Sequence, residues 1–116
     1  MRNLGLDYDG VISANFQHYF QLASDFTRNG WNVYVITAAR AERVKDIITQ
    51  LIRLNFPAIQ VVSRPKNFVS TTGRIGEWKK QQLIKYDIDL WFENDIKFYE
   101  QAGVDFSDVK TTIIRI

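Results

Sequence analysis

The chain has 116 residues, of which 46% are hydrophobic and 14% aromatic, enough for one domain with a single core, and this composition excludes wholesale disorder. The absence of cysteine excludes disulfides, thiolate metal sites and a cysteine nucleophile, and it is typical of a reducing cytoplasm. The formal net charge of +2 is compatible with an anionic ligand but too small to indicate nucleic-acid binding by itself. No run approaches the roughly 18 apolar residues of a membrane helix and no signal segment precedes the first strand-like run, so we expect a cytoplasmic protein without a membrane partner.

Hydrophobic periodicity divides the chain into alternating strand-like and helix-like segments, without a repeat, a low-complexity tract or a linker. Runs rich in β-branched and aromatic residues predict strands, and apolar residues at helical spacing predict helices. Breakers support the boundaries, because Asn29-Gly30 is typical of a helix end and Pro57 closes the second helical region. In chain order we expect a strand over 4–7, a helix over 15–28, a strand over 31–36, a helix over 40–55, a strand over 59–62, a loop over 63–74, a helix over 75–86, a strand over 90–92, a short helix over 95–102 and a strand over 111–115.

Alternation of this kind is typical of parallel strands joined by right-handed crossovers, with helices on both faces of the sheet. The predicted fold class is therefore α/β, a Rossmann-like three-layer open parallel sheet of about five strands, in one domain over 1–116. Such sheets bind ligands beyond the carboxyl ends of their strands, near the point where strand order reverses. The residues just after each predicted strand are therefore the ones to inspect.

Two carboxylates, Asp7 and Asp9, follow the first apolar strand and precede Gly10. Their repulsion at a strand end is unfavourable unless a cation relieves it, and oxygen ligands indicate a hard ion such as Mg²⁺. Gly10 allows a sharp turn where a side chain would obstruct the chain. The alternative is a plain capped turn, since Asp and Gly are common turn formers.

A second acidic cluster, Glu93-Asn94-Asp95, follows another apolar strand. Either Asn94 or Asp95 alternatively caps the helix that comes next. If this strand lies beside the first one, the two acidic clusters converge on one ion. Thr37 ends the second strand, where its hydroxyl suits a phosphate oxygen, although a helix N-cap is the more common role for such a residue.

Basic residues near these strand ends are further candidates for contacts with phosphate. Each of them is alternatively a solvated surface residue. His18, the only histidine, is expected on the exposed side of the first helix, so we expect no histidine-based metal site or triad. The basic candidates are Lys79 and Lys80 on the third helix, Arg40 after the second strand, and Arg64, Lys66 and Arg74 in the long loop.

These motifs, in this order, resemble the haloacid dehalogenase (HAD) superfamily. The first motif of this superfamily is a strand that ends in Asp-x-Asp-Gly-[Thr/Val], and it is matched by Leu-Asp-Tyr-Asp-Gly-Val-Ile at 6–12. The second motif is an apolar strand that ends in Thr or Ser, and it is matched by residues 33–37. Its third, a lysine on the helix before the fourth strand, is matched by Lys79 or Lys80, and the distance to that strand favours Lys79. Its fourth, adjacent aspartates or Gly-Asp after that strand, is matched imperfectly by 93–95.

The resemblance implies a Mg²⁺-dependent phosphomonoesterase. Asp7 would attack phosphorus to form an aspartyl-phosphate, and Asp9 would protonate the leaving oxygen and then activate water. The resemblance places the ion among Asp7, the backbone carbonyl of Asp9 and the acidic cluster Glu93, Asn94 and Asp95, of which Asn94 is a candidate direct ligand. Thr37 and the motif lysine would bind the other phosphate oxygens. The expected substrate contacts are completed by Gly10, Ala38, Arg40 and Lys80.

Many HAD proteins insert a cap domain, but only roughly 20 residues separate Gly10 from the second strand and the loop over 63–76 is short, so we expect a capless core with an open site. An open site favours a large phosphorylated substrate, such as a nucleotide, a nucleic-acid end or a phosphoprotein, or an oligomer in which a partner chain covers it. The irregular fourth motif leaves a catalytically inactive HAD-like binding module as an alternative. A receiver-type phosphoacceptor domain is a further alternative, but it needs an aspartate where 62–64 reads Val-Ser-Arg.

Overall fold

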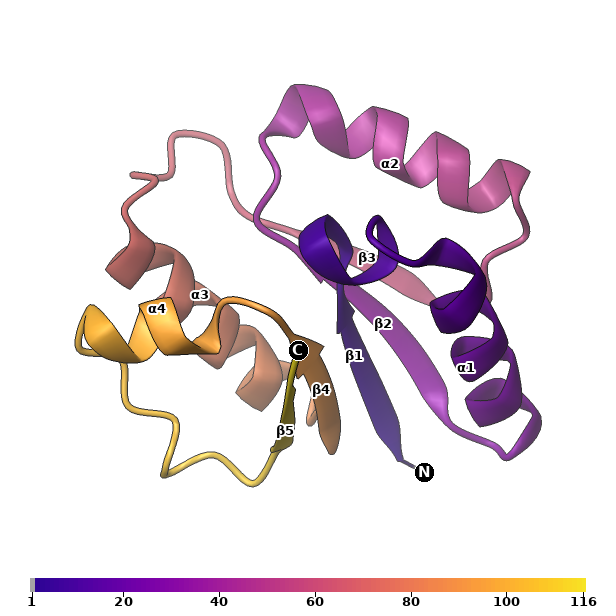
Figure 1. Cartoon of the computed structure of the whole chain (residues 1–116). Coiled ribbons are helices and arrows are strands. Elements are labelled where there is room, and N and C mark those ends of the chain that lie inside the picture. The colour runs from indigo at the N-terminus through magenta and orange to yellow at the C-terminus, as the bar shows by residue number, and fades with distance from the viewer. Residues whose placement is uncertain (1) are drawn as a thin grey trace.

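The computed structural model describes residues 2–116, in which strands and helices alternate along the chain (Figure 1). None of the helices in this range combines the length and the apolar character needed to cross a membrane. The elements are β1 (Asn3–Asp7), a π-helical turn η1 (Tyr8–Ile12), α1 (Phe16–Arg28), β2 (Asn32–Thr37), α2 (Ala41–Arg53), β3 (Gln60–Ser63), α3 (Thr72–Lys85), β4 (Leu90–Glu93), α4 (Ile96–Gln101) and β5 (Thr112–Arg115).

The strands form one sheet in the order β3-β2-β1-β4-β5, and every neighbouring pair is parallel. Leu4 of β1 lies level with Val33 of β2 on one side and with Leu90 of β4 on the other. This arrangement confirms the predicted α/β class with an open, all-parallel sheet. The chain moves from β1 outward to β3 and then returns to β4, so the strand order reverses between β1 and β4.

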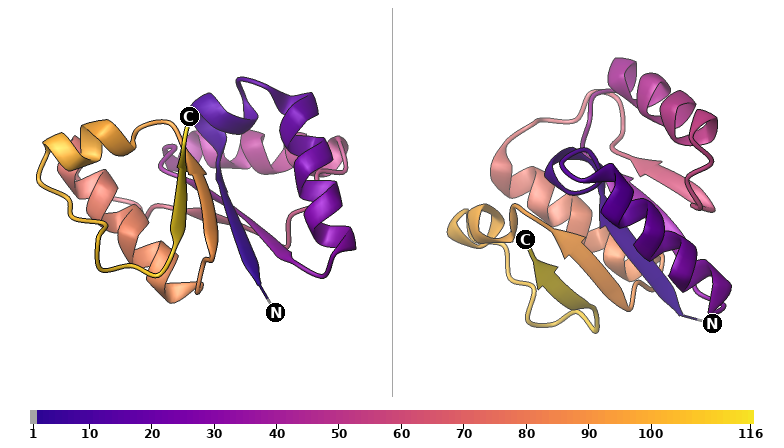
Figure 2. Two further views of the ribbon diagram at one scale, coloured as in Figure 1. Left: turned by 60° about the horizontal axis from the view of Figure 1, so that its bottom comes forward. Right: turned by 45° about the vertical axis from the view of Figure 1, so that its right-hand side comes forward.

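Helices cover both faces of the sheet, with α1 and α2 on one face and α3 and α4 on the other (Figures 1 and 2). Because successive side chains of a strand point to opposite faces, Leu4 and Leu6 of β1 belong to the core beneath α1 and α2. Gly5 faces the other core, where a Cβ atom would lie 3.2 Å from Trp91. Asp7 continues this second series, so β1 directs its last side chain toward α3.

Local capping explains where the structure differs from the predicted boundaries. The third helix begins at Thr72 rather than 75, because the Thr71 side chain accepts a hydrogen bond from the Arg74 amide (3.3 Å) and so caps the helix. The η1 turn was not predicted. It follows β1 directly and includes Gly10, whose φ of 78° lies in the left-handed region.

Polar contacts hold β1 beside β4 at the end of the sheet opposite the carboxyl ends. Asp89, just before β4, accepts hydrogen bonds from the Asn3 amide (2.8 Å) and from Lys110 Nζ (3.1 Å). Although its partial burial alone would raise the pKa of the Asp89 carboxyl, these two donors lower that pKa below its usual range. Asn3 also donates from its side chain to the carbonyls of Tyr86 and Asp87, so the neighbouring strands are fixed in register.

Candidate functional site

Three charged side chains meet at the carboxyl ends of β1 and β4, beneath α3. Lys79, in the middle of α3, places Nζ 3.2 Å from Asp7 Oδ1 and 3.0 and 3.1 Å from the two carboxylate oxygens of Glu93. Asp7 is the last residue of β1 and Glu93 is the last residue of β4. All three residues are buried, since Asp7 is 3% exposed, Lys79 2% and Glu93 0%. We call Asp7, Lys79 and Glu93 the buried triad.

The buried triad holds two carboxylates but a single ammonium group. Burial would lower the pKa of Lys79, but Asp7 and Glu93 raise that pKa above its usual range, so the lysine stays charged. Burial also raises the pKa of Asp7 well above its usual range; Lys79 opposes this shift, and Glu93 reinforces it. With both acids ionised, the cluster therefore lacks one positive charge, and a buried unpaired charge is strongly unfavourable.

The other oxygen of Asp7 faces the side-chain amide of Asn94. One terminal atom of this amide lies 3.2 Å from Asp7 Oδ2 and 3.3 Å from the carbonyl oxygen of Asp9. If that atom is nitrogen, it donates hydrogen bonds to both oxygens, which satisfies the amide without a cation; if it is oxygen, it adds a third oxygen beside these two. In the second orientation the side chain of Asn94, Asp7 Oδ2 and the Asp9 carbonyl offer oxygen atoms, the ligand type that Mg²⁺ prefers, so the residues present fit a hard cation.

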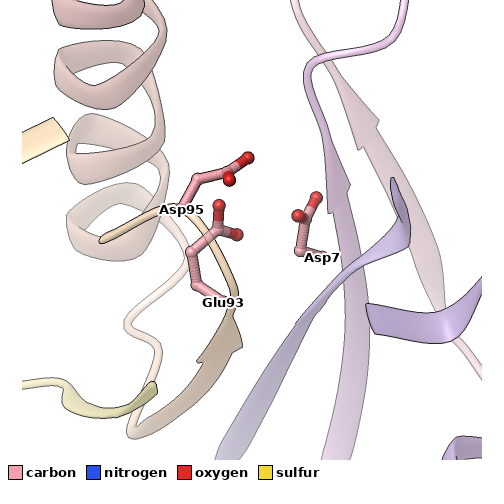
Figure 3. Close-up of side chains that lie close together, drawn as sticks. All are labelled: Asp7, Glu93 and Asp95. Atoms are coloured by element: carbon pink, nitrogen blue, oxygen red, sulfur yellow. The ribbon is translucent and has the colours of Figure 1, made fainter. Parts of the chain in front are cut away.

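A third carboxylate stands beside this position. Asp7, Glu93 and Asp95 each offer an oxygen such that the three oxygens lie within 4.8 Å of one another, and Figure 3 shows Asp7 across from the other two. Both carboxylate oxygens of Glu93 accept hydrogen bonds from Lys79 Nζ, so Glu93 acts as a partner of the lysine. Asp95 occupies the N-cap position of α4 without making a side-chain capping bond, so its carboxylate is the one that remains available.

Gly10 is required for the approach of Asn94 to the η1 turn. A Cβ atom at Gly10 would lie 2.0 Å from the nearer terminal atom of the Asn94 amide, and the φ of 78° is itself strained for any other residue. The Gly10 amide donates to Ser13 Oγ (3.0 Å), so the turn that carries the Asp9 carbonyl is closed on itself. The Asp-x-Asp-Gly spacing thus places the Asp7 carboxylate and the Asp9 carbonyl on one side of Asn94.

The side chain of Asp9 pairs with Arg43 of α2 and makes no ion pair with the buried triad. The two guanidinium nitrogens lie 2.9 and 3.1 Å from its two carboxylate oxygens, and both side chains are about half exposed. Sequence reasoning missed Arg43. The available signal was its position three residues after Arg40, which places both arginines on the same side of the first turns of α2, over the strand ends.

A cavity of about 330 Å³ opens beside Asp7 at the carboxyl edge of the sheet. Several predicted residues line it, and it is bounded by two residues of the loop that follows β3 and by Tyr99 of α4. Tyr99 lies beneath Lys79, with Nζ 5.4 Å from its ring centroid, and no sequence motif marked it because its position is also that of an ordinary core residue. The predicted residues in the lining are Asp7, Asp9, Ala38, Arg40, Lys79, Asp95 and the loop residue Arg64, and the other loop residue is Ser70.

The structure separates the remaining predicted residues. Thr37 is fully buried at the end of β2, and its hydroxyl accepts a hydrogen bond from the Ala39 amide (3.1 Å), which leaves its proton free to be donated. The N-cap of α2 is Arg40 rather than Thr37. Lys80 lies outside the site, where its Nζ is 2.8 Å from Asp108. Arg74 lines a different cavity, beside the start of α3.

Fold and site together define an open α/β protein with a buried carboxylate–lysine cluster and a candidate cation position at the reversal of strand order. No protein-family model matches the chain, and no curated protein and no solved structure matches it either. A functional assignment therefore depends on the geometry of this site and on the order of its motifs.

Proposed function

We propose that the protein is a Mg²⁺-dependent phosphomonoesterase of the HAD type, with Asp7 as the nucleophile. The observation that carries the proposal is the environment of the Asp7 carboxylate. One oxygen lies 3.2 Å from a buried lysine, and the other lies 3.2 Å from the Asn94 amide, which also approaches the Asp9 carbonyl, beside a cavity. A carboxylate flanked by an ammonium group and a cation position suits attack on a phosphate that would otherwise repel it.

The cation position is assigned to Asp7 Oδ2, the Asp9 carbonyl and Asn94, with Asp95 near enough to contribute. A bound Mg²⁺ ion would supply the missing positive charge and offset the charge of the phosphoryl oxygens. The amide of Asn94 is neutral, so this ligand set carries less negative charge than one with paired aspartates. We therefore expect weaker metal binding than two carboxylates after β4 would give.

The reaction assigned to these residues has two halves. In the first, an Asp7 oxygen bonds to phosphorus, the bond from phosphorus to the leaving oxygen breaks, and Asp9 donates a proton to that oxygen. In the second, Asp9 takes a proton from water, the water oxygen bonds to phosphorus, and the bond from the Asp7 oxygen to phosphorus breaks, which restores the Asp7 carboxylate and yields inorganic phosphate. Lys79 and the Thr37 hydroxyl stay in place, both held by their contacts with the protein.

Asp9 must leave Arg43 before it can protonate a leaving group. The pair is half exposed on both sides, and exposed ion pairs contribute little to stability, so opening it is inexpensive. A substrate phosphate in the cavity offers Arg43 a second anionic partner, because guanidinium groups bind phosphate and carboxylate with the same geometry. Substrate binding and release of Asp9 are thus expected to occur together.

The test is turnover of p-nitrophenyl phosphate with Mg²⁺, repeated with a chelator and with Asp7→Asn. Asp25→Asn is a matched control, because Asp25 is an exposed acid on α1 that pairs with Arg28. We expect metal-dependent turnover that Asp7→Asn abolishes and Asp25→Asn retains. Stable labelling by acetyl phosphate without turnover would identify a receiver-type domain instead, and an intact fold without either reaction would identify a binding module.

A further inference from the structure

A second cavity adjoins the one beside Asp7. It also measures about 330 Å³ and lies between the first turn of α2 and the loop after β3. The two cavities share Arg40 and Arg64 in their walls, so they adjoin at these two arginines. We call the cavity beside Asp7 the inner cavity and the second one the outer cavity, which is lined further by Glu42, Lys66, Asn67 and Phe68.

The outer cavity carries an excess of unpaired positive charge. Its lining has three cations, Arg40, Arg64 and Lys66, against the single carboxylate of Glu42. Within residues 2–116 none of the three cations forms an ion pair, whereas Arg43 and Lys79 in the inner cavity are both engaged by acids. Unpaired cations around a concavity indicate an anionic ligand, because each can pair with it without breaking an ion pair.

Arg64 is held in position before any ligand arrives. Its guanidinium carbon lies 5.9 Å from the centroid of the Phe68 ring, and its Nη1 donates to Ser70 Oγ. Pro65 follows it and limits the freedom of the loop backbone. Phe68 is itself packed edge-on against the buried Trp78 at 6.4 Å, so the arginine rests on a ring anchored to the core. An arginine fixed in this way loses less conformational entropy on binding an anion.

We propose that the outer cavity binds a second phosphate carried by the leaving group, so that the preferred substrates are bisphosphorylated, as a nucleoside bisphosphate or a phosphorylated nucleic-acid end is. This inference rests on the proposed function, because the inner cavity is taken to hold the phosphate that is removed. Arg64 and Lys66 contact the second phosphate, and Arg40 lies between the two phosphates. The leaving group spans the junction of the two cavities.

The experiment compares adenosine 3′,5′-bisphosphate with adenosine 5′-monophosphate as substrates for removal of the 5′-phosphate. We expect kcat/KM to be roughly 10-fold higher for the bisphosphate, mainly through KM, because one charge-assisted contact is typically worth about a factor of ten. The Arg64→Ala/Lys66→Ala variant should bring this ratio close to one. Arg53→Ala should preserve it, since Arg53 lies at the other end of α2, about 20 Å from Arg40. Equal kcat/KM for both nucleotides in the unaltered protein, or a preference that survives the double variant, would overturn the proposal.

Calorimetric binding of the same two nucleotides to Asp7→Asn separates this proposal from the proposed function. Tighter binding of the bisphosphate that is lost on adding Arg64→Ala supports the outer cavity even if the protein turns over no phosphate ester. Equal affinities for both nucleotides refute a phosphate site in the outer cavity even if p-nitrophenyl phosphate is hydrolysed. A 5′-phosphorylated dinucleotide, whose second phosphate is an internal diester, identifies the source of the second phosphate. If it also binds more tightly than adenosine 5′-monophosphate, the ligand is a nucleic-acid end. If it does not, the ligand is a free bisphosphate with a terminal second phosphate.

Discussion

Replacing Lys79 by methionine is expected to lower the free energy of unfolding by about 3–5 kcal/mol, the usual cost of removing one partner of a buried ion pair. The side chain of Lys79 is 3% exposed and contacts two carboxylates at 3.0–3.2 Å, so its loss leaves two buried acids facing each other. For a chain of this size the loss corresponds to a fall of roughly 10–25 °C in Tm. Methionine keeps most of the volume, so a cavity contributes little.

The neighbouring lysine supplies the matched control. Lys80→Met also removes an ammonium group from α3, but its partner Asp108 is 67% exposed and can be solvated when the lysine is gone. Urea unfolding in the presence of a chelator, followed by circular dichroism, should therefore show a large fall in midpoint for Lys79→Met and little change for Lys80→Met. Equal midpoints for the two variants would refute the reasoning that the charges of the buried triad hold β1, β4 and α3 together.

The same charge count predicts that Asp7→Asn changes the free energy of unfolding in the opposite direction to Lys79→Met. Without metal this substitution removes the excess negative charge and leaves the neutral pair of Lys79 with Glu93, so the free energy of unfolding should rise, by roughly 0.5–2 kcal/mol. Mg²⁺ at 100 times its Kd should stabilise the unaltered protein by about 2.7 kcal/mol and should stabilise Asp7→Asn much less. An Asp7→Asn protein that is less stable than the unaltered one in chelator would contradict this account.

Three further substitutions test other parts of the structure. Gly10→Ala should weaken Mg²⁺ binding about 10- to 100-fold in a thermal-shift titration, because its Cβ would displace Asn94; unchanged affinity would argue against the cation position. Gly76→Ala should lower the unfolding free energy by about 1–3 kcal/mol in spite of its better helix propensity, since a Cβ there would lie 2.8 Å from Tyr99. Asp89→Asn should cost about 0.5–1 kcal/mol at pH 7, because Asp89 is partly exposed. Because the pKa of Asp89 is lower in the folded than in the unfolded protein, Asp89 stabilises the fold above its unfolded pKa, and this contribution is lost as pH falls through its folded pKa. The difference in unfolding free energy between Asp89→Asn and the unaltered protein should therefore disappear in acid. A difference that persists in acid would contradict this explanation.

Local patterns were sufficient to predict the fold class and most element boundaries. The β-branched and aromatic runs and the helical spacing of apolar residues depend only on neighbours along the chain, so Leu4 to Asp7 and the segments from 31 to 36 and 90 to 92 could be recognised as strands. The η1 turn and the early start of α3 were missed because they depend on single contacts, such as the bond from Arg74 to Thr71.

The sequence by itself determined which chemical groups stand at strand ends, since Asp7, Asp9 and the 93–95 cluster each follow an apolar run. Only the tertiary structure decided how these groups pair. Lys79 and Lys80 are adjacent in sequence, but neighbouring positions on a helix differ by about 100° in direction. The docking of α3 on β1 and β4 therefore selects the lysine that lies between Asp7 and Glu93 and leaves the other with Asp108. The pairing of Asp9 with Arg43 likewise depends on the approach of α2 to the η1 turn, a long-range contact between positions 34 residues apart that no local pattern encodes.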